Sequence, residues 1–539
     1  MKISERKFEI YMRKGFLKII TCLFLLVFGL GVFAACDDGA PSLEYEKVNG
    51  TYKVVGIGTY EEGELIIPET YKGKPVTAIG AEAFKGIRDI GAVVIPDSVT
   101  VIEAGAFRNC VNLTEITMSN SVTTIGKEAF AYCNQVKAIT LPETLTTISE
   151  GAFAFCRNLR SIDIPDSVQT IGDYAFQVCA SMKTATFGTG LRTIGEKAFW
   201  DCAALTSVVI PDGAPTNIAK KAFLNCTSLE YVSLGNDVLS VGESAFSIAK
   251  EETNLTTNIT GLLLREVVIG NKVHTIGANA FNNTRKLYKI TLGSGLQNIG
   301  DGAFEDCQLL REIVNDSTLT LTPGTMNYGG IAAQAWYVHN STEPTRISRD
   351  ENGLVYYTLG EKKILIAVVL ADSAMIEIPD DVTEIAAYAC YNEQYITGIK
   401  IGNGCKTIGY KAFGNCYKIR ELYLGNTVET IEEDAFYNNV SIGIVVFGPS
   451  VKTVGVGAFR KKGDESSSDG WRDYKMYFEG TKEQWNAITW LKNAEGKTRN
   501  EILTDTSNGG IIAFYSETNP GSASGLYWRY LEDGTPKVW

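Results

Sequence analysis

An Ala-Phe pair recurs along this chain at a nearly fixed interval. Steps of 23 residues connect the phenylalanines of two runs: Phe84, Phe107, Phe130, Phe153, Phe176 and Phe199, and later Phe413, Phe436 and Phe459. A constant period of roughly 20–30 residues is typical of stacked coils, in which each repeat packs on its neighbours. The period therefore predicts a solenoid whose phenylalanines are core residues. Further copies stand at Phe223, Phe246, Phe281 and Phe304.

The coil around Phe130 shows how one repeat is built. Residues 113–118 have the pattern of a short strand, and Val122–Ile125 and Ala129-Phe130 add two further apolar pairs. One coil cannot bury all of these groups, whereas stacked coils bury them in a continuous core. Gly126 suits a left-handed turn, although other coils carry larger residues there. We predict a mainly β solenoid of about 14 coils, counting Cys390 as the occupant of one phenylalanine slot.

The same slots resemble those of a known family. Leu113, Ile116, Val122, Ile125 and Cys133, with the Ala-Phe pair, closely resemble the repeat of BspA-type leucine-rich-repeat bacterial surface proteins. The resemblance covers about residues 50–460. It implies a leucine-rich-repeat solenoid with short strands, and a role in adhesion or host-protein binding.

Breaks in the period divide the chain. An insert at 314–374 separates a first run of repeats, 44–313, from a second run, 375–470. The last part, 471–539, is rich in tryptophan and is predicted to be a C-terminal cap or accessory segment. A polar stretch within 247–264 is expected to form a surface loop.

The pattern of the N-terminus predicts an export signal. In residues 1–35, basic side chains precede an apolar run, and small residues stand directly before Cys36. This pattern resembles a bacterial lipoprotein signal, which implies lipidation of Cys36 and a short tether at 36–43, although Phe33 stands where leucine is usual. An uncleaved anchor and ordinary secretion with cleavage at Ala35 are the alternatives. We expect an extracytoplasmic, surface-anchored protein whose only membrane contact is this N-terminal lipid.

The cysteines follow the repeat. Of 12 cysteines, eight stand three residues after a repeat phenylalanine: Cys110, Cys133, Cys156, Cys179, Cys202, Cys226, Cys307 and Cys416. Asn283 and Asn439 are assigned to the same slot in other coils, which favours a ladder of buried thiols over disulfides between adjacent coils. The spacing does not match that of zinc-binding cysteine pairs.

Several classes of function fit this chain poorly. The net charge of −12, in a chain whose signal segment is basic, argues against binding of nucleic acid. His274 and His339 lie in no nucleophile–base motif and are expected to be solvated, and the sequence has no metalloprotease motif or phosphate loop. We expect a protein that is not an enzyme and uses no cofactor or metal.

The strand positions predicted to face outward are mostly small and hydroxyl-bearing. Interface hot spots favour Tyr, Trp and Arg, so Tyr231 and Tyr423 are the candidate contact residues of this face. Trp485 and Trp528 are the candidates in the C-terminal segment. The leading hypothesis is a monomeric adhesion protein that contacts a protein or extracellular-matrix ligand. Carbohydrate or cell-wall binding through the Trp-rich segment, and a structural surface spacer, are the alternatives.

Overall fold

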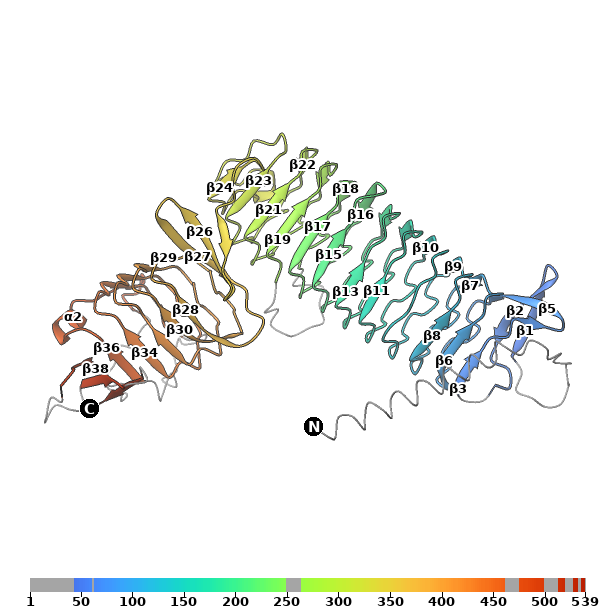
Figure 1. The fold of residues 1–539 in the computed structure, drawn as a ribbon, viewed down its shortest axis with the longest axis horizontal. Coiled ribbons are helices and arrows are strands. Elements are labelled where there is room, and N and C mark those ends of the chain that lie inside the picture. The colour runs from blue at the N-terminus through green and yellow to red at the C-terminus, as the bar shows by residue number, and fades with distance from the viewer. Residues whose placement is uncertain are drawn as a thin grey trace.

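The protein is a long β-solenoid of about 17 turns that bends near its middle (Figure 1). The structure, a computed structural model, describes residues 43–60, 63–248, 263–460, 475–498, 512–518, 527–531 and 535–538. The turns form two stacks, β1–β24 and β25–β40, which have largely separate hydrophobic cores. The number of turns exceeds the 14 predicted, because segments without the Ala-Phe pair also add turns.

The first stack carries two rows of mostly parallel strands. One row is a single sheet in the order β1-β2-β5-β7-β9-β10-β12-β14-β16-β18-β20-β22, with β4 paired to β5. Its strands are β1 (Glu44–Val48), β2 (Thr51–Gly56), β4 (Thr70–Tyr71), β5 (Lys74–Ile79), β7 (Val101–Ile102), β9 (Thr124–Ile125), β10 (Thr147–Ile148), β12 (Thr170–Ile171), β14 (Thr193–Ile194), β16 (Thr216–Ile218), β18 (Val238–Val241), β20 (Thr275–Ile276) and β22 (Asn298–Ile299). The other row consists of β3-β6-β8, β11-β13 and β15-β17-β19-β21-β23-β24. Its strands are β3 (Gly63–Ile66), β6 (Ile90–Ile95), β8 (Glu115–Met118), β11 (Ser161–Asp163), β13 (Thr184–Thr186), β15 (Ser207–Ile210), β17 (Tyr231–Leu234), β19 (Glu266–Ile269), β21 (Lys289–Leu292), β23 (Glu312–Asn315) and β24 (Tyr337–His339).

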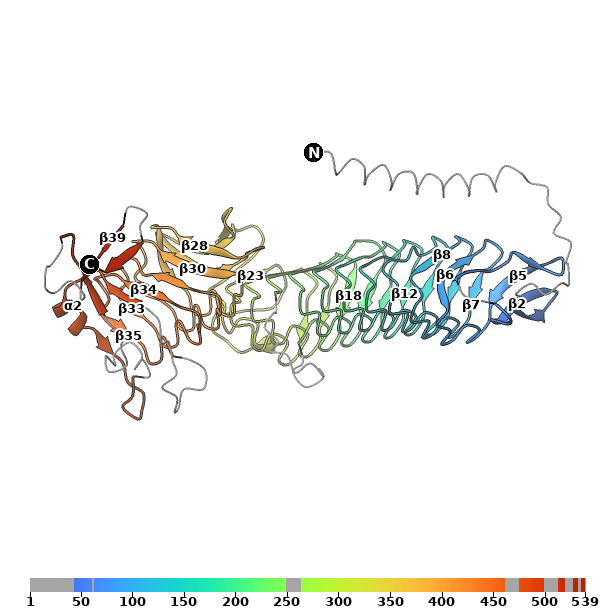
Figure 2. The ribbon, with the colours of Figure 1, turned by 90° about the horizontal axis from the view of Figure 1, so that it is seen from below.

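The second stack repeats this plan with sheets β25-β26-β27-β29-β31-β33-β35-β37 and β28-β30-β32-β34-β36-β38-β39-β40. Figure 2 shows β28, β30, β34 and β39 following one another toward the C-terminus. The strands of the first sheet are β25 (Ile347–Arg349), β26 (Leu354–Leu359), β27 (Lys362–Val368), β29 (Val382–Ile385), β31 (Thr407–Ile408), β33 (Thr430–Ile431), β35 (Thr453–Val454) and β37 (Thr489–Trp490). Those of the second are β28 (Ala374–Ile378), β30 (Ile396–Ile401), β32 (Glu421–Tyr423), β34 (Ile444–Phe447), β36 (Lys475–Phe478), β38 (Ile512–Tyr515), β39 (Tyr527–Tyr530) and β40 (Pro536–Val538). Within the described residues, two short helical turns complete the fold, η1 (Tyr328–Gly330) and α2 (Lys482–Asn486).

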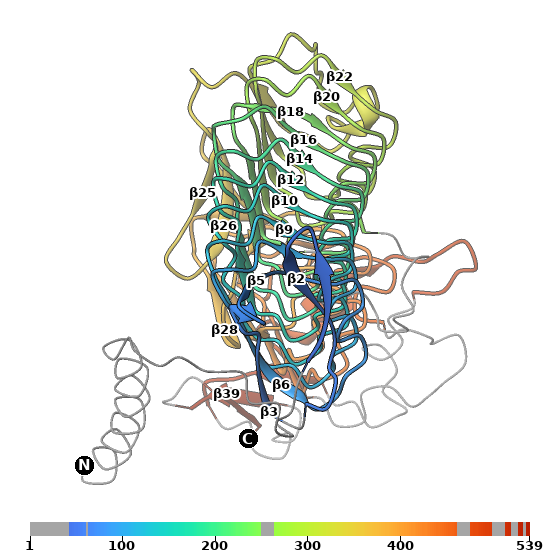
Figure 3. The same cartoon turned by 90° about the vertical axis from the view of Figure 1, so that its right-hand side faces the viewer.

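Register follows from the Thr-Ile pair that ends most coils. In β9 and β10, Thr124 lies opposite Thr147 and Ile125 opposite Ile148. The isoleucines are buried and the threonines are exposed, because successive strand residues point to opposite faces. Figure 3 shows β9, β10, β12 and the strands that follow placed one behind another along the stack. A slip of one residue would expose every isoleucine, so this register is strongly specified.

The phenylalanines form two continuous columns, as the sequence predicts. From Phe84 to Phe304, neighbouring rings stack at centroid distances of 5.1–5.5 Å, and Phe413, Phe436 and Phe459 form the second column. Cys390 occupies the first slot of the second column and is fully buried. Burying one such ring contributes about 1.5–3 kcal/mol, so the columns are a main source of stability.

The buried thiol ladder is confirmed for the described cysteines, all ten of which are free and buried. From Cys110 to Cys307, each Sγ of the slot donates a hydrogen bond of 3.1–3.4 Å to the carbonyl of the residue in the phenylalanine slot one coil earlier. Asn439 Nδ2 makes the equivalent bond to Phe413 O at 2.9 Å. The assignment of Asn283 to this slot is wrong, because Thr284 occupies it and contacts Cys307 Sγ at 3.1 Å. The slot therefore requires a small buried donor rather than a disulfide partner.

The prediction of a left-handed backbone at Gly126 is wrong, because the residues with positive φ lie elsewhere in the coil. They lie two residues before and two residues after the phenylalanine, as in Glu128 (φ 53°) and Tyr132 (φ 64°). Gly126 is needed for close packing instead, since a Cβ there would lie 2.7 Å from Ala104 N in the preceding coil.

The insert ends one stack and begins the other. Gly329 O accepts a hydrogen bond from Phe304 N at 3.0 Å, and Ile331 and Ala332 are buried in the first core. The antiparallel hairpin β26–β27 then opens the second stack, with β27 pairing in parallel to β29. The insert thus closes the first column and supplies the first strands of the second stack.

Buried charges join the two stacks where the solenoid bends. Lys286 of the first stack makes an ion pair with Glu393 of the second, and both side chains are largely buried. Burial, together with the positive charge of Arg265, lowers the pKa of Lys286 to about 7. Tyr288 and Leu309 of the first stack pack into the second core, so the junction is a packed interface.

The C-terminal segment caps the second stack. Trp485 of α2 packs edge-to-face on Phe447 and Phe478 at 5.5 and 5.3 Å. Trp528 is fully buried and donates from Nε1 to Phe478 O at 3.2 Å. Among the residues that the structure describes, no helix has both the length and the apolar character needed to cross a membrane.

Candidate functional site

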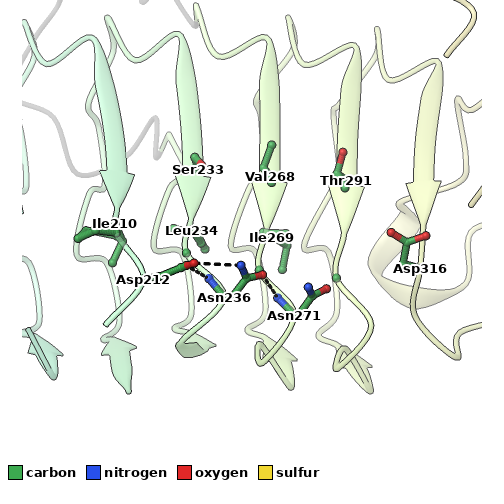
Figure 4. Close-up of a pocket in the computed structure, with 14 residues that line it drawn as sticks. Ile210, Asp212, Ser233, Leu234, Asn236, Val268, Ile269, Asn271, Thr291 and Asp316 are labelled. Carbon is green, nitrogen blue, oxygen red and sulfur yellow. Dashed lines mark hydrogen bonds between the residues drawn. The ribbon is translucent and has the colours of Figure 1, made fainter. Parts of the chain in front are cut away.

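A shallow hollow of about 380 Å³ lies along one edge of the sheet β15-β17-β19-β21-β23 (Figure 4). Its floor includes Gly235, Gly270 and Gly293, at which a Cβ would lie within 2.7 Å of the backbone of the preceding coil. These glycines let the coils approach one another closely, so coil packing explains them without a ligand.

Polar side chains in the hollow accept hydrogen bonds from backbone N–H groups of the following coil. Asp212 Oδ1 accepts a hydrogen bond from Asn236 N at 2.5 Å, and Asn236 Oδ1 accepts one from Asn271 N at 3.2 Å (Figure 4). The second stack repeats the arrangement, since Asp380 Oδ1 accepts from Asn403 N at 2.6 Å. The row is therefore a structural ladder that links successive coils, and it favours a packing role for the hollow.

A cluster of tyrosines in the second stack is the stronger candidate for a binding site. It lies on what we call the turn edge, the side of the solenoid formed by the turns around the Ala-Phe pairs. We call it the tyrosine ridge: Tyr388, Tyr391, Tyr410, Tyr417 and Tyr437. All five are half-buried, so each shows part of its ring to solvent. The Tyr388 ring meets those of Tyr391 and Tyr410 edge-to-face at 5.6 and 5.3 Å. Aromatic pairs of this geometry hold one another in place.

Asparagines of neighbouring coils donate hydrogen bonds to two of the ridge hydroxyls. Asn415 Nδ2 donates to Tyr391 OH at 2.7 Å, and Asn438 Nδ2 donates to Asn415 Oδ1 at 2.8 Å. Asn438 Nδ2 also lies 3.4 Å from Tyr417 OH. The rings are thus held before any partner arrives, which lowers the entropy lost on binding.

Cationic side chains accompany the ridge. Lys411 Nζ lies 4.8 Å from the centre of the Tyr410 ring, and the Arg460 guanidinium lies 4.5 Å from that of Tyr437. Two hydrogen bonds, at 2.6 and 2.9 Å, join Arg460 to the buried Asp434 carboxylate and raise the pKa of Arg460. Burial raises the pKa of the Tyr437 hydroxyl above its ordinary value. The ridge therefore combines tyrosine and arginine, the residue types that dominate interface energetics.

The repeats identify the family to which the chain belongs. A family model described as a BspA type leucine rich repeat region matches residues 64–180, 148–261, 260–327 and 372–465, in six copies. These matches span more than half of the chain. The protein belongs to the BspA-type leucine-rich-repeat family. BspA-type proteins are commonly bacterial surface proteins, and their solenoids are typically non-catalytic.

Solved structures of bacterial leucine-rich-repeat proteins are similar to this BspA-type chain. A protein from Bacteroides ovatus is 21% identical with a TM-score of 0.43, over 90% of this chain and 100% of that chain. A leucine rich cell surface protein from Faecalibacterium prausnitzii is 20% identical with a TM-score of 0.29, over 86% and 100%. The T. pallidum leucine rich repeat protein is 23% identical with a TM-score of 0.33, over 35% and 87%. A comparison with curated proteins finds no match.

The four predicted contact residues of this BspA-type protein differ in exposure: Tyr231 lies in the first stack and the other three in the second, where Tyr423 packs against the cluster that contains Trp528. Tyr231 on β17 is 38% exposed, and Tyr423 on β32 is half-buried, with its hydroxyl 3.2 Å from Glu421 Oε2. Trp485 is half-buried against the last core phenylalanines, and Trp528 is 0% exposed. Trp528 therefore cannot contact a ligand in this structure, because the aromatic residues of the tail close the open end of the core. Cys36 lies outside the described residues.

Some outward strand positions and one histidine are covered, contrary to expectation. Glu312 on β23 is fully buried beneath the insert, where it accepts hydrogen bonds from Thr345 Oγ1 at 2.5 Å and Arg346 N at 2.8 Å. His339 is also buried, and its Nε2 lies 3.4 Å from Glu312 Oε1. His274 is exposed, as predicted. In the described part of the chain, no group of three or more His, Cys, Asp or Glu residues could hold a metal ion.

The tyrosine ridge was not predicted from the sequence, because its residues lie in turns and not at the outward strand positions or in the Trp-rich segment. The ridge residues flank the core phenylalanine or cysteine of their coils, and only the Tyr388 position carries a tyrosine in an earlier coil, at Tyr174. The signal was present as a local enrichment of tyrosine in residues 388–437.

Proposed function

We propose that this protein is a surface-anchored lipoprotein that makes adhesive contacts with a protein or extracellular-matrix ligand through the tyrosine ridge. The observation that carries the proposal is the set of half-buried tyrosines held by the Asn415–Asn438 ladder and flanked by Lys411 and Arg460. Pre-ordered aromatic side chains bind at a low entropic cost, and Tyr and Arg supply most hot-spot energy. Lipidation at Cys36 would place the solenoid outside the cell with its far end free.

The tail-based alternative has weaker support. Carbohydrate binding commonly uses an exposed aromatic face, whereas Trp528 is fully buried and Trp485 packs on Phe478. These contacts support a capping role for the described residues of 471–539. A spacer role would leave the organised ridge without a purpose.

The full-length protein in detergent can be tested against a panel of immobilised extracellular-matrix proteins. The ridge variant Tyr391→Ala/Tyr437→Ala should lower affinity by about tenfold or more, as expected for loss of a hot spot. The matched control Tyr231→Ala/Tyr423→Ala removes two tyrosines from the strand face and should leave affinity nearly unchanged. Melting curves of both variants verify folding.

A larger loss of affinity in Tyr231→Ala/Tyr423→Ala than in Tyr391→Ala/Tyr437→Ala would show that the strand face binds the ligand. Binding to no member of the panel by the wild-type protein would favour the spacer.

A further inference from the structure

The first stack departs from its own repeat in three consecutive coils. The position two residues after the core phenylalanine is occupied there by Tyr132, Phe155 and Val178, whose φ angles are 64°, 61° and 57°. Side chains of this kind adopt the left-handed region at a cost, which is greatest for a β-branched residue such as Val178. Coil geometry therefore does not explain these three residues. The other described left-handed residues at this position are glycine, asparagine or aspartate: Gly86, Asn109, Asp201, Asn225, Asn283, Asp306, Asn392, Asn415 and Asn438.

Two of the three residues form an aromatic stack on the turn edge. The rings of Tyr132 and Phe155 are parallel within 4° at a centroid distance of 4.5 Å, and both side chains are half-buried. Arg108 lies over the Tyr132 ring at 6.0 Å, and Arg157 lies over the Phe155 ring at 5.7 Å. Because the rings stack along the solenoid, their edges face outward, and ring edges carry positive partial charge.

The same three coils each carry an exposed cation five residues further on, namely Lys137, Arg160 and Lys183. These residues lie in direct succession, since Arg160 N donates to Lys137 O at 3.0 Å and Lys183 N donates to Arg160 O at 2.8 Å. The next two coils have Thr206 and Glu230 at this position. The run of cations therefore coincides with the run of unfavourable left-handed residues.

These residues form what we call the cationic-aromatic patch: Tyr132, Phe155, Val178, Lys137, Arg157, Arg160 and Lys183. We propose that it binds an acidic segment of a partner polypeptide. Cations and ring edges both attract carboxylates, and the patch is a local reversal of sign in a chain of net charge −12. Pyranose rings stack on aromatic faces, and here the faces are occupied by the neighbouring ring and by arginine. This surface lies in the first stack and is independent of the tyrosine ridge.

The test uses the full-length protein in detergent and a fluorescein-labelled peptide rich in glutamate and leucine, with affinity measured by fluorescence anisotropy at two salt concentrations. The variant Tyr132→Asn/Phe155→Asn/Val178→Asn should raise the melting temperature by roughly 2–4 °C, because asparagine suits the left-handed backbone. It should also weaken peptide binding by about tenfold. Greater stability together with lost binding is the combination that a purely structural role would not produce.

The charge variant Lys137→Ser/Arg160→Ser/Lys183→Ser should weaken binding and its salt dependence at an unchanged melting temperature. Its control, Lys400→Ser/Lys406→Ser/Lys452→Ser, makes the same change of charge in the second stack and should leave affinity nearly unaltered. The proposal is overturned if the asparagine variant melts lower than wild type, or if the peptide binds all variants equally. Binding of a heparin fragment at the patch without binding of the peptide would also overturn it, in favour of an anionic polysaccharide.

Discussion

At the position two residues after the core phenylalanine or cysteine, the second stack has Asn392, Asn415 and Asn438, whereas three coils of the first stack have Tyr132, Phe155 and Val178. The backbone is left-handed at all of these residues. In the second stack the asparagines suit that backbone, and Asn415 and Asn438 also donate to the hydroxyls of Tyr391 and Tyr417. In the first stack the backbone is strained and the side chains themselves form the outer surface.

The interiors of the two stacks show no such contrast. Both contain a phenylalanine column with rings 5.0–5.5 Å apart and a row of small donors that bond to the preceding coil. Stacking thus fixes the identity of the inward residues, while the turn edges are free to differ. Information about partners is therefore expected at those edges.

The largest expected effect tests whether the two cores are independent. Phe130→Ala in the first column should cost about 3–5 kcal/mol, because it leaves a cavity between two stacked rings. Since Phe130 and Phe413 belong to separate cores, calorimetry should show two transitions, of which Phe130→Ala lowers one and Phe413→Ala the other. A single transition that moves equally in both variants would show that the stacks unfold as one unit.

The next effect concerns the junction between the stacks. Glu393→Gln should cost about 3 kcal/mol at pH 6, because it leaves the buried Lys286 ammonium without its partner. Burial sets the folded pKa of Lys286 at about 7, below its ordinary value of 10.5, so the unfolded chain binds more protons between these values and stability rises with pH. The loss caused by Glu393→Gln should therefore shrink from pH 6 to pH 9. A loss that is constant in chemical denaturation over this range would contradict the buried charge.

A smaller effect probes the donor slot that both stacks share. Cys156→Ala removes the thiol hydrogen bond to Phe130 O, which keeps its bond from Cys133 N, and also removes the packing of the buried sulfur; it should cost about 1–3 kcal/mol in urea denaturation. Because burial raises the pKa of Cys156 to about 12, its thiol should resist alkylation in the native protein and react after unfolding. Rapid native alkylation at Cys156 would refute the buried donor. The matched variant Cys416→Asn, which introduces the side chain that Asn439 places in the same slot, is expected to be tolerated.

The smallest effect exchanges the residues that distinguish the two turn edges. Asn415→Val should cost about 1–2 kcal/mol, because it combines left-handed strain with loss of the hydrogen bond to Tyr391. Val178→Asn in the first stack should change stability in the opposite direction. Equal signs for the two substitutions would show that this position obeys different rules in the two stacks.

The repeat allowed the buried core residues to be predicted from the sequence, but not the arrangement of side chains on the turn edges. Phe130, Ile125 and Cys133 recur at a fixed period, so their burial followed from stacking alone. The tyrosine ridge depends on neighbours in adjacent coils, such as Asn438 beside Asn415, which a residue-by-residue reading of one coil does not reveal. The burial of Trp528 and Glu312 depends on where the tail and the insert fold back, and no local pattern specifies that.

Oxidative footprinting of tyrosines tests most directly whether binding information lies on the turn edges. The full-length protein is exposed to hydroxyl radicals with and without a bound matrix protein, and oxidation is read by mass spectrometry at Tyr391, Tyr417 and Tyr437 and at Tyr231. Protection of the three ridge tyrosines with unchanged oxidation of Tyr231 is the predicted result. Protection of Tyr231 with unchanged oxidation of the ridge would contradict it and place the contact on the strand face.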